Sequence, residues 1–234
     1  MIGLGTIVNT LAIIVGGIIG LIIKDGLKSR FQKTLMNALG LATIFIGAAG
    51  AMSGMLKVNG QQLETQGTML LIFSLVIGGL IGEFLNIEDK LEKLGEWLKK
   101  KVKAKGNDPF VEGFVTASLV VCVGAMAIVG ALQDGLLADP STLYAKAILD
   151  FTIIMVFAAT LGIGAVFSAL PVGVYQGTIT IFATFLKPLL TNTVITNLSF
   201  IGSVLIFAVG VNLCFDKKIK VGNLLPAMLI PFFF

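Results

Sequence analysis

The sequence contains no histidine, only two cysteines and few charged residues. Charged residues make up 13% of its 234 positions, whereas soluble domains average about 25%. Hydrophobic residues make up 56% of the chain, and the mean hydropathy is +0.98. The low charge excludes a soluble globular protein, and the lack of long polar tracts excludes a disordered one. Because Cys122 and Cys214 both lie inside apolar runs, a disulfide-rich secreted domain is also excluded.

The missing histidine removes His-based metal sites, the usual proton shuttle and the common hydrolase triads. The sequence also contains no cysteine cluster, Walker A loop or dinucleotide fingerprint. An intramembrane aspartyl protease needs two close carboxylates inside the bilayer. Asp134 and Asp150 are able to approach each other, but neither has a recognisable protease setting. We therefore expect no enzyme activity, no cofactor and no metal site.

Intervals without charge divide the chain into segments that match the thickness of a bilayer, which needs about 20 apolar residues per helix. The expected spans are residues 3–23, 34–56, 66–84, 111–133, 147–168, 172–191, 195–215 and 221–234. The last of these is short, and it crosses only if Lys220 snorkels to the interface. The prediction is an all-α, polytopic membrane protein of seven or eight transmembrane helices that forms a single domain over residues 1–234.

One interval without charge, residues 151–186, is too long for one helix. Ser168, Pro171 and Gly173 are typical of a turn near its middle, so we divide the interval there. This division places Asp150 and Lys187 at the membrane boundary on one side, where they would form at most an interfacial ion pair. It predicts an interior without charged groups.

Lysines and arginines are distributed unevenly between alternate connections. Fourteen of the seventeen follow the first, third and seventh spans, and only Lys57, Lys146 and Lys187 fall on the other side. The positive-inside rule therefore predicts cytoplasmic basic connections and an N-terminus outside. The excess of basic over acidic residues then reflects membrane topology, and we expect no nucleic-acid partner.

Glycines follow two patterns. The string Gly16-Gly17-Ile18-Ile19-Gly20 returns as Gly78-Gly79-Leu80-Ile81-Gly82, and each copy precedes a basic connection and another span. We interpret this as a duplicated N-terminal hairpin, although such strings also recur by chance in glycine-rich membrane chains. Glycines four residues apart permit close helix packing in lipid, either within the bundle or in a homo-oligomer, which we expect.

Residues 86–105 have the pattern of a cytoplasmic amphipathic helix. Apolar residues fall on one helical face and Glu and Lys on the other, with Trp97 as an anchor at the lipid interface. We expect this helix to fix the topology, and gating by contact with lipid is the alternative.

Polar residues within or beside the spans are the candidates for a substrate or ion path. They favour either a narrow path with acidic mouths or a carrier for a neutral or zwitterionic solute. Hydrogen bonds between helices are the alternative explanation for each amide and hydroxyl. The candidates are Asn9, Asn37, Glu83, Glu112, Ser118, Asp134, Asp150, Gln176 and Asn212.

Several strings in the sequence resemble the membrane family called domain of unknown function 554 (DUF554), or YdfK-like. They include Gly3-x-Gly5-Thr6-x2-Asn9, Gly82-Glu83-x-Leu85-x-Ile87-Glu88 and Glu112-Gly113-Phe114-Val115-x-Ala117-Ser118-Leu119. The resemblance extends over essentially the whole chain. It implies a polytopic protein of seven or eight helices in the cytoplasmic membrane of a bacterium or archaeon, and it implies no particular activity or functional residue.

We therefore expect a small transporter or channel that passes a small solute or ion across the cytoplasmic membrane. The alternative is a non-transporting membrane scaffold or regulator that acts through the amphipathic helix. The expected partners are the lipid bilayer, the small solute or ion and further copies of the chain.

Overall fold

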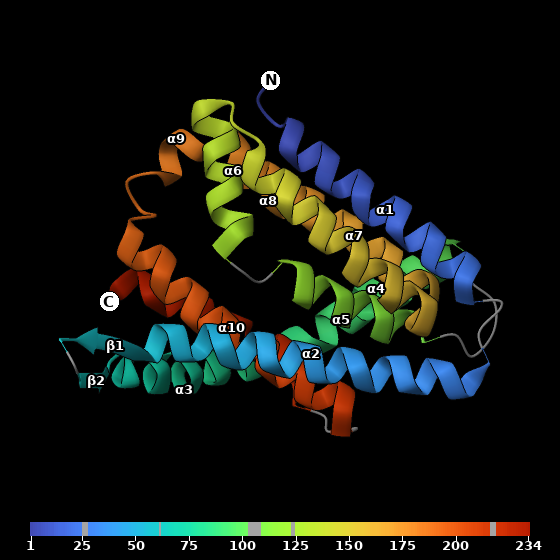
Figure 1. Ribbon diagram of the computed structural model, residues 1–234, viewed down its shortest axis with the longest axis horizontal. Coiled ribbons are helices and arrows are strands. Elements are labelled where there is room, and N and C mark those ends of the chain that lie inside the picture. Colours follow the sequence, from blue (N-terminus) through green and yellow to red (C-terminus); the bar gives the residue numbers. More distant parts are fainter. Residues whose placement is uncertain (25–27, 61, 103–108, 123–124, 216–218) are drawn as a thin grey trace. The chain divides into compact units, whose positions relative to one another are not determined.

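The computed structural model describes the chain except for residues 25–27, 61, 103–108, 123–124 and 216–218 (Figure 1). The main helices are α1 (Leu4–Lys24), α2 (Ser29–Met55), α3 (Thr68–Leu85), α4 (Ile87–Val102), α5 (Phe110–Cys122), α6 (Ala125–Leu137), α7 (Ser141–Leu161), α8 (Ala169–Ile181) and α10 (Asn192–Phe215). The short elements are α9 (Ala183–Leu186), α11 (Val221–Leu224), the 3₁₀ helices η1 (Gly162–Ser168) and η2 (Leu225–Phe233), and the strands β1 (Leu56–Asn59) and β2 (Gln62–Thr65).

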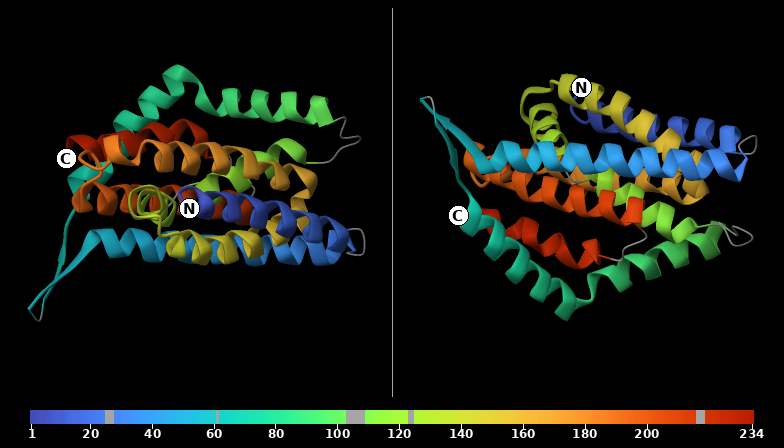
Figure 2. Two further views of the ribbon diagram at one scale, coloured as in Figure 1. Left: turned by 90° about the horizontal axis from the view of Figure 1, so that it is seen from above. Right: turned by 60° about the horizontal axis from the view of Figure 1, so that its bottom comes forward.

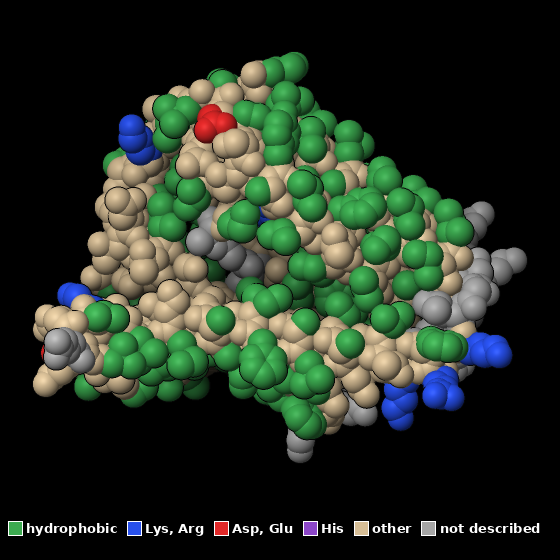
Figure 3. All heavy atoms as spheres, viewed as in Figure 1, with side chains coloured by type: hydrophobic (Ala, Val, Ile, Leu, Met, Phe, Trp, Pro, Cys, Tyr) green, Lys and Arg blue, Asp and Glu red, His purple; other side chains and the backbone are tan. Residues whose placement is uncertain are grey.

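Among the described residues, five helical segments are long and apolar enough to cross a membrane. A sixth is counted if α5 and α6 form one broken span. Hydrophobic side chains are spread over the face drawn in Figure 3, and most of the Lys and Arg side chains in view lie at its margins. Such exposed apolar surface is typical of contact with lipid. The expected all-α membrane protein is confirmed, and the count of seven or eight spans stays a prediction.

The chain divides into two compact units. Unit 1 contains Met1–Ala38, Leu91–Cys122 and Met126–Pro188. Unit 2 contains Leu39–Lys90, Val123–Ala125 and Leu189–Phe234. The single membrane domain stays a prediction, and the two units are described separately.

In unit 1, α1 packs along α7 through glycines that bring the two backbones close together. Gly5 lies against Leu143, and Gly16 and Gly20 lie against the carbonyl groups of Phe151 and Met155. Contacts that advance together along both helices show that α1 and α7 run in the same direction, side by side in Figure 1.

Along the segment formed by η1 and α8, the contacts with α1 advance in the opposite direction. Gly17 meets Val166, whereas Thr10 meets Gly173 and Thr6 meets Thr180. The segment from α7 to α8 therefore folds back on itself at η1.

The prediction that Ser168, Pro171 and Gly173 form this turn is wrong. The turn begins at Gly162, whose φ of +81° is a conformation that glycine adopts without strain. Pro171 lies in the first turn of α8, where its missing N–H leaves no helix hydrogen bond unmade.

The span predicted over residues 111–133 consists of two helices, α5 and α6, bent by 62°. Phe110 at the start of α5 lies against Gly164 of η1. Near the end of α6, Gly135 lies against Thr180 of α8. The broken helix therefore reaches from one end of the α7–α8 hairpin to the other.

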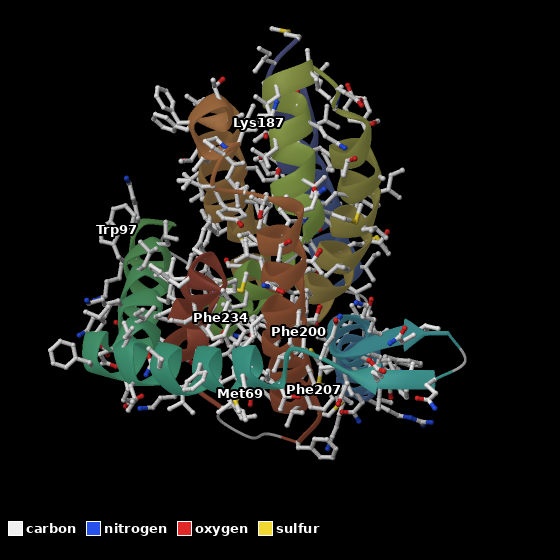
Figure 4. The ribbon with its side chains drawn as sticks, turned by 90° about the vertical axis from the view of Figure 1, so that its left-hand side faces the viewer. Met69, Trp97, Lys187, Phe200, Phe207 and Phe234 are labelled. Atoms are coloured by element: carbon white, nitrogen blue, oxygen red, sulfur yellow. The ribbon has the colours of Figure 1, made fainter. Side chains whose placement is uncertain are left out.

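In unit 2, two pairs of helices run antiparallel. Gly47 and Gly54 of α2 lie against Phe207 and Phe200 of α10, which Figure 4 labels. In the same way, α3 packs against α11 and η2. The core between these helices contains Leu70, Phe200, Ile201 and Ala227.

A short β-hairpin joins α2 to α3 and projects beyond their ends (Figure 2). Its strands are antiparallel, with Leu56 opposite Thr65 and Asn59 opposite Gln62. Gly60 adopts a φ of +64° in the turn. The hairpin is mostly exposed and was not expected from the sequence.

The two glycine strings both allow a close approach of backbones, but the elements that they contact are not equivalent. Gly16 and Gly20 approach the backbone of α7, which runs parallel to α1. Gly78 and Gly82 approach the backbones of Ala227 and Asn223 in elements that run antiparallel to α3. The duplicated hairpin therefore stays a prediction.

The α1–α7 seam predicts opposite effects of one substitution at two glycines. Gly20→Ala places a methyl group against the Met155 carbonyl, and we expect a loss of about 1–3 kcal/mol in unfolding free energy from overpacking. Gly177→Ala in α8 meets no atom within 4 Å and should be neutral or stabilising. Thermal unfolding in detergent measures the stability of both variants. Equal unfolding midpoints for the two would contradict the close packing of α1 against α7.

Candidate functional site

A lysine and an aspartate lie buried together within α7. Lys146 and Asp150 are four residues apart and therefore share one face of the helix. The Lys146 Nζ lies 2.8 Å from Asp150 Oδ1 and 2.7 Å from Oδ2. Lys146 is 7% exposed and Asp150 is 2% exposed, so both charges are withdrawn from solvent.

Two predictions about Asp150 are wrong. Asp150 lies in the middle of α7 and pairs with Lys146, whereas Lys187 lies exposed beyond α9 (Figure 4). The interior of unit 1 therefore does contain charge. The division of the sequence at charged residues began a span at residue 147 and left Lys146 in a loop. A Lys and an Asp at this spacing neutralise each other within one helix, which was the signal overlooked.

The third hydrogen bond of Lys146 reaches the break between α5 and α6. Its Nζ donates to the carbonyl oxygen of Val121 at 2.9 Å. Val121 lies in the last turn of α5, where helix carbonyl groups have no partner within the helix. The ammonium group thus uses its three N–H donors on two carboxylate oxygens and one carbonyl.

Amides from two other helices complete the site. Asn9 of α1 donates through Nδ2 to Asp150 Oδ2 at 3.0 Å and to Gln176 Oε1 of α8 at 3.2 Å. Both amide side chains are fully buried. We call Asn9, Lys146, Asp150, Gln176 and the Val121 carbonyl the central cluster.

The central cluster includes buried polar atoms that make no hydrogen bond to the described part of the chain. Within the described part of the chain, Asn9 Oδ1 and Gln176 Nε2 are buried and have no hydrogen-bond partner. The hydroxyl of Ser118, on α5, is buried without a partner as well. Leaving a buried polar atom unpaired costs about 1–3 kcal/mol, so such atoms point to a bound water, ion or solute.

Asp134 has a different role from the one expected at a channel mouth. It is fully buried and accepts hydrogen bonds from the backbone N–H groups of Gly3 and Gly5 at 3.2 and 3.0 Å. These groups lie at the start of α1, where the helix dipole favours negative charge. Asp134 thus ties the end of α6 to the start of α1.

The other candidate residues of unit 1 are not part of the central cluster. Glu112 is exposed in the first turn of α5, and Asn37 is exposed on α2.

In unit 2, Glu83 and Asn212 stabilise connections. Glu83 accepts hydrogen bonds from Lys220 Nζ at 2.7 Å and from Asn223 Nδ2 at 2.6 Å. The bond to Glu83 raises the pKa of the Lys220 ammonium. Asn223 in turn accepts from the backbone of Glu88, so the end of α3 and the start of α4 are fastened to α11. Asn212 bonds the backbone of Ile219 through both of its amide atoms.

A polar pocket of about 370 Å³ lies at the hairpin end of unit 2. Its lining offers amides, hydroxyls and one aromatic ring, but no charged group. The lining residues are Gly54, Gln66, Gly67, Asn192, Thr193, Thr196, Asn197 and Phe200. None of them was a candidate from the sequence, although the run Thr191-Asn192-Thr193 is an evident polar signal.

The amphipathic helix has the expected form over α4, and residues 103–105 lie outside the described residues. Leu98 is buried with Phe110 and Phe114 of α5. Trp97 is 53% exposed (Figure 4), and the Lys101 ammonium lies 4.8 Å from the centre of its ring. An exposed tryptophan beside lysines is typical of a helix at the headgroup level of a membrane.

Comparisons with known proteins identify relatives along the whole chain. The family model "Protein of unknown function (DUF554)" matches residues 4–234. The chain is similar to "Uncharacterized membrane protein YdfK" of Bacillus subtilis (strain 168), with 35% identity over 228 residues that cover 97% of this chain and 93% of the relative. It is also similar to "Uncharacterized protein YqgA" of Escherichia coli (strain K12), with 29% identity over 231 residues, 97% and 94% of the two chains. No solved structure matches it.

The buried pair predicts non-additive effects on stability. Asp150→Asn alone leaves the Lys146 ammonium buried without its counter-charge, and we expect a loss of about 3–5 kcal/mol in unfolding free energy. The double variant Lys146→Gln/Asp150→Asn removes both charges and should recover much of that loss.

Unfolding in detergent, monitored by circular dichroism, measures the stability of the wild type and of these variants. Glu64→Gln, which changes an exposed carboxylate in β2, is the control and should alter stability by less than about 1 kcal/mol. Additive losses in the double variant would contradict the buried pair.

Proposed function

The chain belongs to the DUF554 family of membrane proteins, and from that premise we propose that it moves a small solute or ion across the cytoplasmic membrane. The observation that carries the proposal is the central cluster. Ionisable residues inside membrane helices are costly and commonly mark substrate or ion pathways. The transported species then binds at the amides of Asn9 and Gln176, the Lys146–Asp150 pair and the end of α5.

The break between α5 and α6 supports transport in particular. Transporter sites are commonly built where a membrane helix is interrupted, because freed carbonyl groups and helix ends then face the substrate. The Val121 carbonyl, bound by Lys146, is such a group.

Helix directions within each unit agree with eight alternating crossings, and the basic connections then favour an N-terminus outside. In unit 1, α1 and α7 run one way, and α8 and the α5–α6 pair run the other. In unit 2, α2 and α10 are antiparallel, as are α3 and the α11–η2 segment. An alternating chain with its basic connections in the cytoplasm has these directions.

The depth of the cluster agrees with a site in mid-membrane. Asp150 lies nine residues after the start of α7 at Ser141, which is about 14 Å at 1.5 Å per residue. Half the hydrocarbon thickness is about 15 Å.

The second candidate function is a membrane scaffold or regulator without transport, and α4 favours it. Trp97 and the lysines at positions 99–101 present an amphipathic surface that suits a lipid interface or a partner helix. Enzyme activity is no part of either proposal.

Flux into proteoliposomes tests transport. We expect uptake of one class from a panel of monovalent cations, anions and amino acids. Asp150→Asn and Lys146→Gln should lower this uptake by about tenfold or more, because each removes a charge from the path. Thr152→Val, on the exposed side of α7, is the matched control and should keep wild-type flux.

Two outcomes would count against transport. One is flux no greater than that of empty liposomes for every class, and the other is full flux in Asp150→Asn. Crosslinking before and after charge reversal at Lys99, Lys100 and Lys101 tests the scaffold function. That function requires that the charge reversal remove a crosslinked partner and that neither the wild type nor the variant show flux.

A further inference from the structure

Three elements of unit 2 meet at the polar pocket beside the β-hairpin, namely the end of α2, the start of α3 and the first turns of α10. Asn192, Thr196 and Phe200 are spaced four residues apart, so they share one face of α10. Gly54 of α2 and Gly67, directly before α3, both lie against the Phe200 side chain. Phe200 is only 2% exposed, so its ring lies at the bottom of the pocket.

Backbone packing keeps the pocket open on the side of α2 and α3. A Cβ atom at Gly54 would lie 2.5 Å from the Cβ of Phe200, so only glycine fits there. Gly67 adopts a φ of +71°, a conformation that glycine reaches without strain. Gln66 is held in place because its backbone N–H donates to the Met55 carbonyl at 2.7 Å, and its Nε2 donates to the Gly54 carbonyl at 3.4 Å.

The polar lining offers hydrogen-bond donors and acceptors together. The amides of Asn192 and Asn197 each carry two N–H donors and one acceptor oxygen, and the Thr193 hydroxyl has both functions. Within the described part of the chain, these two amides make no hydrogen bond to other residues. A solute that uses them must bring both donors and acceptors, and a hydroxyl group brings both on one atom.

The lining contains no charged side chain, which favours an uncharged solute. Lys57 and Glu64 of the hairpin stand opposite each other in the two strands and are not among the lining residues. An ion that leaves water for a pocket without a counter-charge loses more solvation than amides and hydroxyls return.

The size of the pocket and its aromatic floor narrow the choice further. A volume of about 370 Å³ lies at the lower end of the range of small-molecule sites, which is about 300–1,000 Å³. The ring of Phe200 offers a partly negative face and an apolar contact for C–H groups. A sugar-like ring combines hydroxyl groups around its edge with C–H groups on its faces, so it matches the amides and the aromatic floor at once.

We propose that this pocket binds a neutral, polyhydroxylated solute of monosaccharide size. Its hydroxyl groups bond the amides of Asn192 and Asn197, and its C–H groups contact the Phe200 ring. In the orientation proposed above the hairpin lies outside, so the pocket takes up its solute from the external side. The inference goes beyond the proposed function and does not rest on it, because binding is measured without flux.

Saturation-transfer NMR on the full-length protein tests the site by detecting the solute while it is bound. The protein is placed in lipid nanodiscs without any sugar-based detergent, whose headgroup would compete for the pocket. The probes are D-glucose, D-galactose, D-ribose and myo-inositol, with sodium glutamate and lysine hydrochloride as charged solutes of similar size. We expect saturable transfer to at least one neutral probe, strongest at its C–H protons, and none to the charged solutes.

Variants of the lining should weaken this binding without disturbing the fold. Asn192→Ala and Asn197→Ala each remove an amide that has no partner in the described chain, and we expect each to lower the affinity by about three- to tenfold. Thr193→Trp places a large side chain at the exposed edge of the pocket and should abolish binding. Gln62→Ala removes an exposed amide in β2 outside the lining, so this matched control should bind like the wild type.

Three results would overturn the site. They are no saturable transfer to any neutral probe, undiminished binding in the double variant Asn192→Ala/Asn197→Ala, and charged solutes that bind as tightly as the neutral ones. If binding fails while flux through the protein is intact, the pocket proposal is wrong and transport stands. If the expected binding appears without flux, the site is supported and transport is wrong.

Discussion

The cost of keeping a charge away from water governs the architecture of unit 1. A buried ammonium must have a counter-charge and a partner for each N–H group, or it does not stay charged. Lys146 meets this demand with Asp150 and with the carbonyl of Val121. Three helices must therefore come together at one point, α7 with the pair, α1 with Asn9 and α8 with Gln176, and α5 must end beside them.

Glycines make that convergence sterically feasible. The helices of unit 1 approach closely because Gly5, Gly16 and Gly20 replace side chains along the α1–α7 seam. In lipid there is little hydrophobic drive between helices, so such close packing has to supply the association energy. At the end of the seam where α1 begins, the buried carboxylate of Asp134 binds the backbone N–H of Gly5. This contact fixes the position of Asn9, which lies about one helical turn later.

Much of the helical framework could be predicted from the sequence, because apolar runs of bilayer length can hardly be anything but helices. The starts and ends of α1, α3 and α10 lie within about three residues of those expected. The misplaced turn has a physical reason, since proline is tolerated in the first turn of a helix while Gly162 alone supplies the positive φ. The apolar run around the break after Cys122 contains a glycine, Gly124, but glycines are so frequent in this chain that this one does not stand out.

Among the candidate site residues, Asn9, Asp150 and Gln176 were identified from the sequence as polar groups in apolar surroundings, yet their meeting point was not. Tertiary packing brings together residues that are 141 and 167 positions apart. Lys146 was missed because each charge was treated as a boundary. A charge that has a partner four residues away on the same helix is not evidence of a boundary.

The central claim is that water and ions reach the central cluster. Cys122 ends α5 directly after Val121, so its thiol reports on access to that point. The most direct measurement is the rate at which a small, positively charged, water-soluble thiol reagent modifies Cys122 in membranes, in a Cys214→Ala background. We predict that the reagent modifies Cys122 in the folded protein. A Cys122 that reacts only after unfolding would contradict the account.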